Sequence, residues 1–188
     1  MISYILLILY MSYQPFVQGS LDFFADKYYT DRKQQKKSHK IYDISHYYFR
    51  DLQNYDYLAD IIAFTCLVPM IFYYKIIPEY ISFFLPIFIT RSIVNRMTVL
   101  PKQKNCRISD TSITSGGCYD KIYSGHFASV LLATLLYYKY NIINLNILVL
   151  MNIINGTTIL LTRGHYTVDI YVALVTTLLF YQNNIKIN

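Results

Sequence analysis

The sequence predicts an all-α, multi-pass membrane helix bundle with about six transmembrane helices. Hydrophobic residues make up 54% of the 188-residue chain, while charged residues make up only 15%, well below the roughly one quarter that is usual in soluble domains. The apolar residues also gather in segments close to the ~20 residues that a helix needs to cross a bilayer. Because an open strand cannot satisfy its backbone hydrogen bonds in lipid, we expect these segments to be helices.

The N-terminal unit, residues 1–56, is predicted to combine one membrane helix with a basic extramembrane loop. Residues 2–17 are apolar but lack a basic flank before them and a small-residue cleavage signature after them. A first membrane helix therefore fits these residues better than a cleaved signal peptide does. Residues 18–56 are rich in lysine, arginine and aspartate, and this solvated or interfacial loop has room for a short amphipathic helix near 41–52.

Residues 57–182 are predicted to form the main membrane domain, followed by a short polar tail at 183–188. Pro78 and Pro86 should kink the third predicted helix without ending it. The fifth predicted helix is polar for a lipid-facing segment and should pack inside the bundle. Its polar residues are Asn144, Asn146, Asn152 and Asn155. The five crossings predicted in this domain lie at 57–74, 76–95, 124–139, 141–162 and 166–182.

Six crossings place the loops at 18–56 and 96–123 and the turn at 162–166 on one membrane face. The ionisable residues of the predicted helices gather at that same face. Such residues are costly within a membrane, so each one is a candidate for function. They are Asp56 and Asp60 at the start of the second helix, Arg91 and Arg96 at the end of the third, His126 at the start of the fourth, and His165 and Asp169 at the start of the sixth.

The two histidines of this set have neighbours suited to catalysis. His165 and Asp169 are four residues apart, which places them on one helical face within reach of each other. The carboxylate would fix the imidazole tautomer, so that the second ring nitrogen can act as a base or nucleophile. His126 follows Ser124 and Gly125 at a predicted helix start, where serine can cap the helix and glycine lets the backbone approach an anion. His126 would protonate a leaving oxygen.

Three arginines complete the predicted site. Arg91, Arg96 and Arg163 would offer forked, permanently charged donors to phosphate oxygens. Together with the histidines they form a predicted phosphoryl-transfer site that needs no metal or other cofactor. Each feature alone also has a structural explanation, since arginines snorkel at helix ends and Asp56 and Asp60 can cap a helix. Their joint occurrence on one face favours catalysis.

The net charge of +6 is compatible with nucleic acid, anionic lipid or a phosphate-bearing substrate as partner. No aromatic-basic repeat or zinc-ligand spacing supports nucleic acid, which we exclude. Cys66 lies in an apolar run and is interpreted as a small core residue. Cys106 and Cys118 share one loop and would be equally consistent with a disulfide or with two thiols.

Three stretches carry a family resemblance. Residues 117–126 are GCYDKIYSGH, residues 165–173 are HYTVDIYVA, and residues 91–101 are RSIVNRMTVLP. These resemble, in turn, the C-G-D-x-x-Y-S-G-H-T, H-Y-T-V-D-V-x-x-A and R-x6-T-T-L-P motifs of the sphingomyelin synthase family, a branch of the type 2 phosphatidic acid phosphatase superfamily. Tyr119 stands where the family has glycine and Phe127 where it has threonine, and both changes could reshape the headgroup pocket.

The resemblance implies a type 2 phosphatidic acid phosphatase-like core and a lipid phosphotransferase. His165, oriented by Asp169, would take phosphocholine from phosphatidylcholine as a phospho-histidine, His126 would protonate the departing diacylglycerol, and ceramide would accept the headgroup. Water as acceptor would make the protein a lipid phosphate phosphatase, and a catalytically inactive membrane scaffold or transporter is the non-enzymatic alternative. The implied substrate-binding residues are Arg91, Asp120, Tyr123, Ser124, Gly125 and Arg163.

The predicted partners are the lipid bilayer and its phospholipid, ceramide or diacylglycerol substrates, and the sequence does not predict an oligomeric state. Most lysines and arginines lie on the predicted active-site face, which the positive-inside tendency would place in the cytosol. The family has its site on the lumenal or extracellular face, in the secretory pathway or plasma membrane. We follow the family because the arginines have a substrate-binding reason to be there.

Overall fold

The computed structural model describes residues 42–98, Leu100 and residues 122–185, together with Ile5, Ile8, Leu9 and Ser12, and the side chains of 183–185 are left out. Within this part of the chain every regular element is a helix. The first predicted crossing lies largely outside the described residues, as do Cys106, Cys118 and most of the loop at 96–123.

All five segments predicted as helices after residue 56 are helical. A short helix also lies in the segment that has room for an amphipathic one near 41–52. The elements are α2 (Ile44–Tyr48), the 3-10 turn η2 (Gln53–Tyr55), α3 (Tyr57–Leu67), α4 (Pro69–Phe72), the 3-10 turn η3 (Tyr74–Ile76), α5 (Ile77–Met97), α6 (Gly125–Lys139), α7 (Leu145–Leu161) and α8 (Thr167–Ile185).

Prolines mark two of the helix starts. The second predicted helix is divided, because α3 ends at Leu67 and α4 begins at Pro69. Proline has no N–H for the helical ladder and is best tolerated in a first turn. Pro78 lies in the first turn of α5 for the same reason, and α5 then continues through Pro86 to reach 21 residues.

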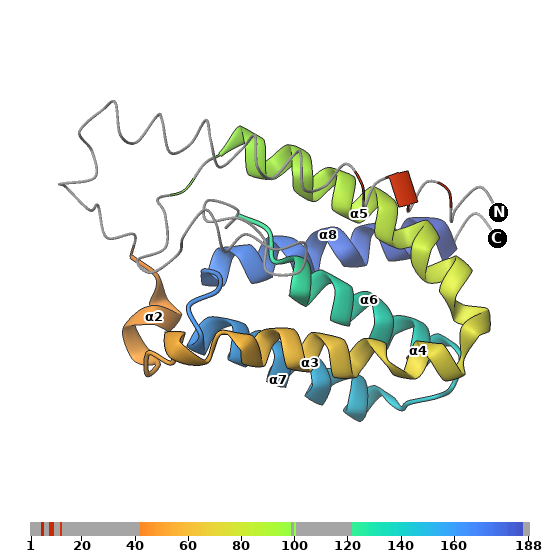
Figure 1. Ribbon diagram of the computed structural model, residues 1–188, viewed down its shortest axis with the longest axis horizontal. Coiled ribbons are helices and arrows are strands. Elements are labelled where there is room, and N and C mark those ends of the chain that lie inside the picture. The colour runs from red at the N-terminus through yellow and green to blue at the C-terminus, as the bar shows by residue number, and fades with distance from the viewer. Residues whose placement is uncertain are drawn as a thin grey trace.

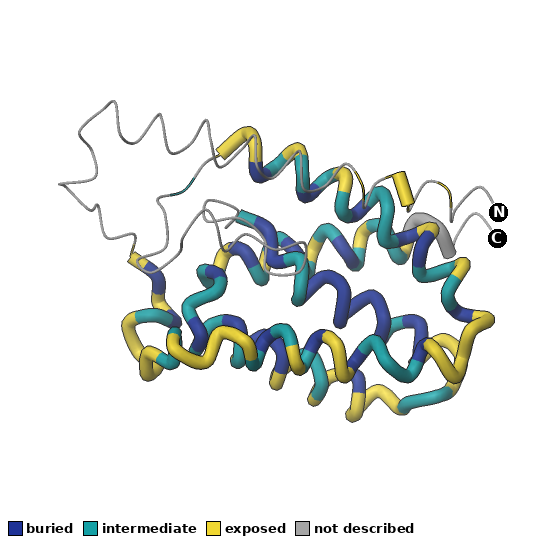
Figure 2. The backbone as a smooth tube through the Cα atoms, in the orientation of Figure 1, coloured by how far each residue is buried: buried dark blue, intermediate teal, exposed yellow. Residues whose placement is uncertain are grey.

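The central element of the bundle is α6, which contacts α3, α5, α7 and α8 (Figure 1). Ten of its 15 residues are buried, and buried positions follow most of its length in Figure 2. At 1.5 Å per residue α6 is about 23 Å long, shorter than the ~30 Å hydrocarbon core of a bilayer. Its neighbours cover it on several sides, so most of its surface contacts protein.

The outer faces of the surrounding helices are apolar and exposed (Figure 2). Exposed apolar surface of this kind often marks a site of protein or membrane interaction. Two helical stretches, Gln53–Phe72 and Tyr74–Met97, are long and apolar enough to cross a membrane. These features suggest membrane association, and the six crossings remain a prediction. The exposed side chains include Ile61, Phe64, Ile71, Phe72, Ile89, Ile93, Leu150, Ile153, Tyr171 and Leu179.

Among the described residues, α7 packs against α6, α3 and α2 and leaves its other face exposed, so this part of the structure does not confirm the prediction that its asparagines bring it inside the bundle. Asn152 donates from Nδ2 to Thr134 Oγ1 of α6 at 2.8 Å, and Asn155 is fully buried. Asn144 instead caps the N-terminus of α7, and Asn146 is exposed. Asn152 therefore binds α6 and Asn144 caps the helix, whereas the buried side chain of Asn155 has no hydrogen-bond partner in the part of the chain that the structure describes. The opposite face of α7 is apolar and exposed.

Candidate active site

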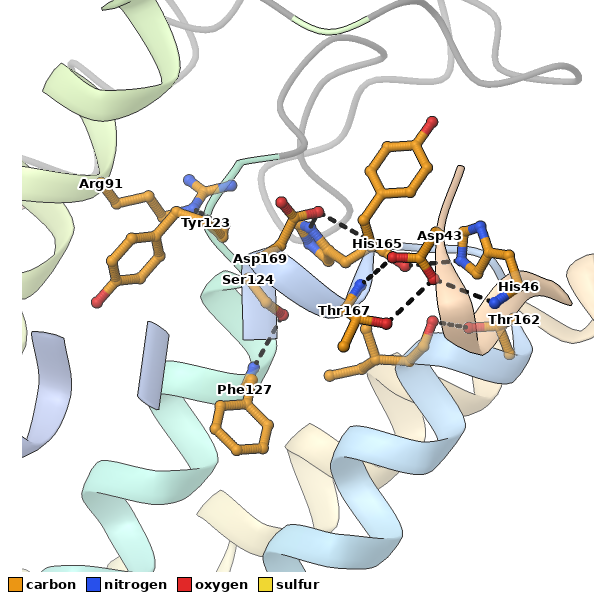
Figure 3. A network of polar contacts seen from close by, with 12 residues as sticks. Asp43, His46, Arg91, Tyr123, Ser124, Phe127, Thr162, His165, Thr167 and Asp169 are labelled. Atoms are coloured by element: carbon orange, nitrogen blue, oxygen red, sulfur yellow. Dashed lines mark hydrogen bonds and ion pairs between the residues drawn. The ribbon is translucent and has the colours of Figure 1, made fainter. Parts of the chain in front are cut away.

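The first turn of α8 fixes the pair formed by His165 and Asp169 (Figure 3). Asp169 Oδ2 accepts a hydrogen bond from Tyr166 N at 2.7 Å, as the third residue of a helix does in a capping box. The same oxygen lies 3.4 Å from His165 Nδ1. Asp169 is fully buried and His165 is 8% exposed. The pair is thus in contact, at a separation longer than a good hydrogen bond.

A second histidine–carboxylate pair lies where α6 begins. Ser124 caps α6, because its Oγ accepts from Phe127 N at 3.3 Å. This places His126 in the first turn, with Nε2 2.6 Å from Asp60 Oδ1 on α3. The side chains of His126 and Asp60 are 22% and 44% exposed, in contrast to the buried His165 and Asp169. One pair is therefore built into the bundle, and the other is open at its end.

The two pairs belong to the same end of the bundle. Ser124 N donates to Asp169 O at 3.5 Å, so the residue that caps α6 contacts the residue that pairs with His165. Figure 3 shows Ser124 beside Asp169, with Arg91 and Tyr123 on the side of α5. The described residues next to His126 and His165 are thereby brought together, whereas most of the loops predicted to share their membrane face lie outside the described residues.

Arg91 is buried at this end of α5 and does not snorkel outward. Its Nε donates to Tyr123 O at 3.2 Å, and the residue is only 6% exposed. A Cβ added to Gly125 would lie 3.1 Å from that same Nε, so the glycine leaves the space that the guanidinium occupies. Arg96, one helical turn further on, is exposed. Of these two arginines, Arg91 is the one placed beside the start of α6.

The turn between α7 and α8 positions Arg163. Gly164 N donates to Ile159 O at 3.1 Å, which ends α7 in a Schellman motif. Arg163 itself has a φ of 58°, a conformation that residues other than glycine adopt uncommonly. Its Nη2 donates to Phe49 O at 2.7 Å, and its Nε lies 3.9 Å from Asp51 Oδ2. These donors are directed at the segment before α3, and the role of Arg163 as a phosphate ligand remains a prediction.

Asp43 and His46 were not among the predicted site residues, yet they contact the start of α8 (Figure 3). Asp43 caps α2 by accepting from His46 N at 3.1 Å, and it also accepts from the Ser45 hydroxyl. The same carboxylate accepts from Thr167 N at 2.7 Å and from Thr167 Oγ1 at 3.1 Å. His46 Nε2 donates to His165 O at 3.0 Å. An aspartate before a short helix indicates a cap, but no local pattern indicates this distant contact.

The electrostatics of this contact favour a charged Asp43 and a neutral His46. Burial alone would raise the pKa of Asp43, but hydrogen bonds from Ser45, Thr167 and His46 outweigh it and hold the pKa below the usual 3.8. Burial lowers the pKa of His46 below the usual 6.5; the Asp43 carboxylate opposes this change, and the Arg163 guanidinium adds to it.

The remaining candidates are placed as follows. Asp60 pairs with His126, whereas Asp56 occupies the N-cap position of α3 without a side-chain capping bond. Asp120 and Tyr119 lie outside the described residues. Phe127 packs in the core, where a Cβ on Gly156 would lie 3.2 Å from its ring, so this departure from the resembling family affects helix packing. In the part of the chain that the structure describes, no cluster of three His, Cys, Asp or Glu side chains could hold a metal ion.

Comparison with known proteins gives one partial match to a family model. Residues 117–185, less than half of the chain, match the family model described as "PAP2 superfamily C-terminal". No curated protein and no solved structure matches the chain. The matched range contains His126, His165 and Asp169, and members of the superfamily are typically phosphatases or phosphotransferases that act on lipid phosphates. The match therefore supports membership of the PAP2 superfamily for the region that carries both histidines.

Proposed function

We propose that this protein is a membrane lipid phosphotransferase that moves a phosphocholine-type headgroup from a phospholipid to ceramide through a phospho-histidine intermediate. One observation carries the proposal: two histidine–carboxylate pairs, His165–Asp169 and His126–Asp60, lie at the same end of the bundle. Residues 57–182 are the proposed catalytic domain. The PAP2 match is compatible with either a phosphotransferase or a phosphatase, and the motif resemblance leads us to the former.

In the first proposed step, His165 Nε2 attacks the phosphorus of phosphatidylcholine. A P–N bond forms while the P–O bond to diacylglycerol breaks. Asp169, facing Nδ1 on the other side of the ring, stabilises the positive charge that the ring acquires. His126 gives a proton to the departing oxygen, so that diacylglycerol leaves as a neutral alcohol. Because Asp60 engages Nε2 of His126, we assign this proton to Nδ1.

In the second step, the ceramide hydroxyl gives its proton to His126 and its oxygen attacks the phosphorus. The P–N bond breaks, sphingomyelin forms, and both histidines return to their starting states. Arg91, held beside Gly125, supplies positive charge for the phosphate oxygens in both steps. Among the other predicted substrate-binding residues, Tyr123 and Ser124 are fully buried, so we assign them to positioning Arg91 and α6.

The test is headgroup transfer by the full chain reconstituted into vesicles that contain labelled phosphatidylcholine and ceramide. We expect labelled sphingomyelin and an equal amount of diacylglycerol, with a loss of about a thousandfold or more in His165→Ala. Release of inorganic phosphate from phosphatidic acid, without sphingomyelin, would assign the protein to the lipid phosphatases instead. The absence of both products would leave the inactive scaffold or transporter as the better explanation.

Glu79→Gln is the matched control for these experiments. Glu79 lies at the opposite end of the bundle, where it binds Lys139 and Tyr140. This change removes one carboxylate from a helix without altering either histidine pair, so transfer should stay within about twofold. Melting temperatures of all variants in detergent would separate loss of chemistry from loss of fold.

We also propose that the site faces the lumen or the extracellular space, which makes the protein an integral membrane protein of the secretory pathway or plasma membrane. Glycosylation acceptors introduced between residues 102 and 115 would test the orientation. Modification is expected if the loop is lumenal. A loop that stays unmodified, while an acceptor after residue 183 becomes modified, would place the site in the cytosol.

A further inference from the structure

The segment before α3 is hydrogen-bonded to the turn that carries His165. We define this segment, residues 43–52, as the strap. Apart from its contacts through Asp43 and His46, Leu52 N donates to Leu161 O at 2.9 Å, and Phe49 O accepts from Arg163. The strap therefore contacts the end of α7, the turn and the start of α8.

Asp43 provides the contact closest to the chemistry. The N-cap position of α8 is held by Tyr166, whose side chain cannot cap a helix as serine or aspartate does. Asp43, a residue of the strap, caps α8 instead, because its carboxylate accepts hydrogen bonds from Thr167 N, the first N–H of α8, and from the Thr167 hydroxyl. At the same time it caps α2. One buried carboxylate thus holds two helix starts together.

The contacts continue directly to the proposed nucleophile. Thr167 lies between His165 and Asp169 in the chain, and the Tyr166 N–H, its neighbour, binds Asp169. On the other side, His46 donates to the carbonyl of His165 itself. The strap therefore binds the backbone on both sides of Tyr166, in the four-residue interval that sets the distance between His165 Nδ1 and Asp169 Oδ2.

We infer that Asp43 is a positioning residue for the proposed reaction, which holds the 165–169 turn so that the His165 ring stays aligned with Asp169 and with the bound phosphate. This inference rests on the proposed function for its kinetic consequence. Its structural part, the capping of α8 by the strap, stands independently of any activity. Misplacement of a reacting group by about 1 Å can cost roughly a hundredfold in rate, so a contact outside the chemistry can have a kinetic effect.

The decisive variant is Asp43→Ser in the full chain. Serine is a good N-cap, so the cap of α2 should be kept. Its side chain is too short to reach Thr167, so only the contact with the start of α8 should be lost. We expect kcat for headgroup transfer to fall about ten- to a hundredfold while KM changes less than about threefold. The matched control is Asp51→Asn, which removes an exposed carboxylate from the same strap and should leave kcat within about twofold.

Amide hydrogen exchange gives a readout that does not depend on activity. In Asp43→Ser, exchange at Tyr166 and Thr167 should accelerate at least tenfold, while exchange in the middle of α6 stays unchanged. If wild-type protein shows no transfer but this local acceleration occurs, the proposed function fails and the capping role stands. The inference would be overturned if hydrogen exchange at Thr167 were unchanged in Asp43→Ser. It would also be overturned if the variant raised KM while kcat stayed at the wild-type value.

A second variant covers the case in which Asp43→Ser unfolds the protein. Thr167→Val keeps the shape and the backbone N–H of Thr167 but removes the hydroxyl that donates to Asp43 Oδ1. It should produce the same pattern on a smaller scale, with kcat reduced about three- to tenfold and local exchange accelerated. Wild-type kcat and wild-type exchange in this variant would count against the strap as a positioning element.

Discussion

The two ends of the bundle are each tied together by carboxylates, but in different ways. At the end with the histidines, Asp43 and Asp169 are buried and accept hydrogen bonds from backbone N–H groups. At the other end, Glu79 binds Lys139 Nζ and Tyr140 OH, each at 2.6 Å, and the Lys139 side chain is 38% exposed. The first arrangement fixes backbone geometry, whereas the second joins flexible side chains near solvent.

This difference has energetic consequences. Leaving a buried acceptor without its donors, or a buried donor without its acceptor, lowers the free energy of unfolding by about 1–3 kcal/mol. The loss is larger when one of the groups is charged. An exposed ion pair contributes about 0–1 kcal/mol, because solvent screens it and two long side chains must be ordered. Substitutions at the histidine end that remove these backbone hydrogen bonds should therefore change local structure as well as catalysis. Equivalent substitutions at the Glu79 end should change little.

Among the substitutions of carboxylates, the largest effect is expected from Asp169→Asn. The amide oxygen can still accept from Tyr166 N, so α8 should start normally, but the neutral side chain no longer stabilises a positive His165 ring. We expect kcat for headgroup transfer to fall by about a hundred- to ten-thousandfold, with a melting temperature close to that of the wild type. A fall of less than tenfold would show that Asp169 only caps α8.

A smaller effect is expected from Asp60→Asn, which weakens the contact that orients the part-buried His126. Because His126 is the proposed proton donor and Asp60 only orients its ring, kcat should fall about ten- to a hundredfold. The matched control is Asp56→Asn, one turn earlier, whose side chain makes no capping bond. Equal kinetics for the two variants would remove Asp60 from the mechanism.

Much of this site could be predicted from the sequence, because its main contacts are local. Ser124 before Gly125 predicts a helix cap, and Ser124 caps α6. His165 and Asp169 are in contact as their spacing predicts, but they do not share a helical face, because α8 begins only at Thr167 and His165 precedes it. The crossing pattern also places Asp60 and His126 at one end. What could not be predicted is which side chains meet between distant segments, as Asp60 does with His126 and Asp43 with Thr167.

The position of α7 could not be predicted for a related reason. Asparagine in an apolar helix indicates a polar contact, but it does not indicate how many sides of the helix are covered. The amide nitrogen of Asn152 needs only one neighbouring helix, which it binds through Thr134, and Asn144 binds the start of its own helix. The number of polar residues in an apolar helix therefore overestimates how far the helix is buried when those residues share one face or cap the helix.

The pH dependence of stability should distinguish the two ends through His46. Its pKa is lower in the folded protein than the ordinary 6.5, so the unfolded chain binds more protons in that range. The contribution of His46 to stability is complete above about pH 6.5 and is lost as the pH falls through the lower folded-state pKa. Thermal unfolding in detergent should show a smaller loss below pH 6.5 in His46→Gln, whose amide can still donate to His165 O. If the melting temperatures of the wild type and of His46→Gln depended on pH in the same way, protonation of His46 would not contribute to the loss of stability at low pH.

The smallest effect is expected from Glu79→Gln in unfolding measurements. Glutamine can still accept from Tyr140, and only the charge attraction to Lys139 is lost. Because this pair is partly exposed, the free energy of unfolding should fall by less than about 1 kcal/mol, and added salt should reduce the difference further. A double-mutant cycle with Lys139→Met would isolate the pair and should give a coupling energy below about 1 kcal/mol. A coupling of 3 kcal/mol or more would mean that the far end is as tightly constrained as the histidine end, and the contrast between backbone-bound and side-chain-bound carboxylates would no longer hold.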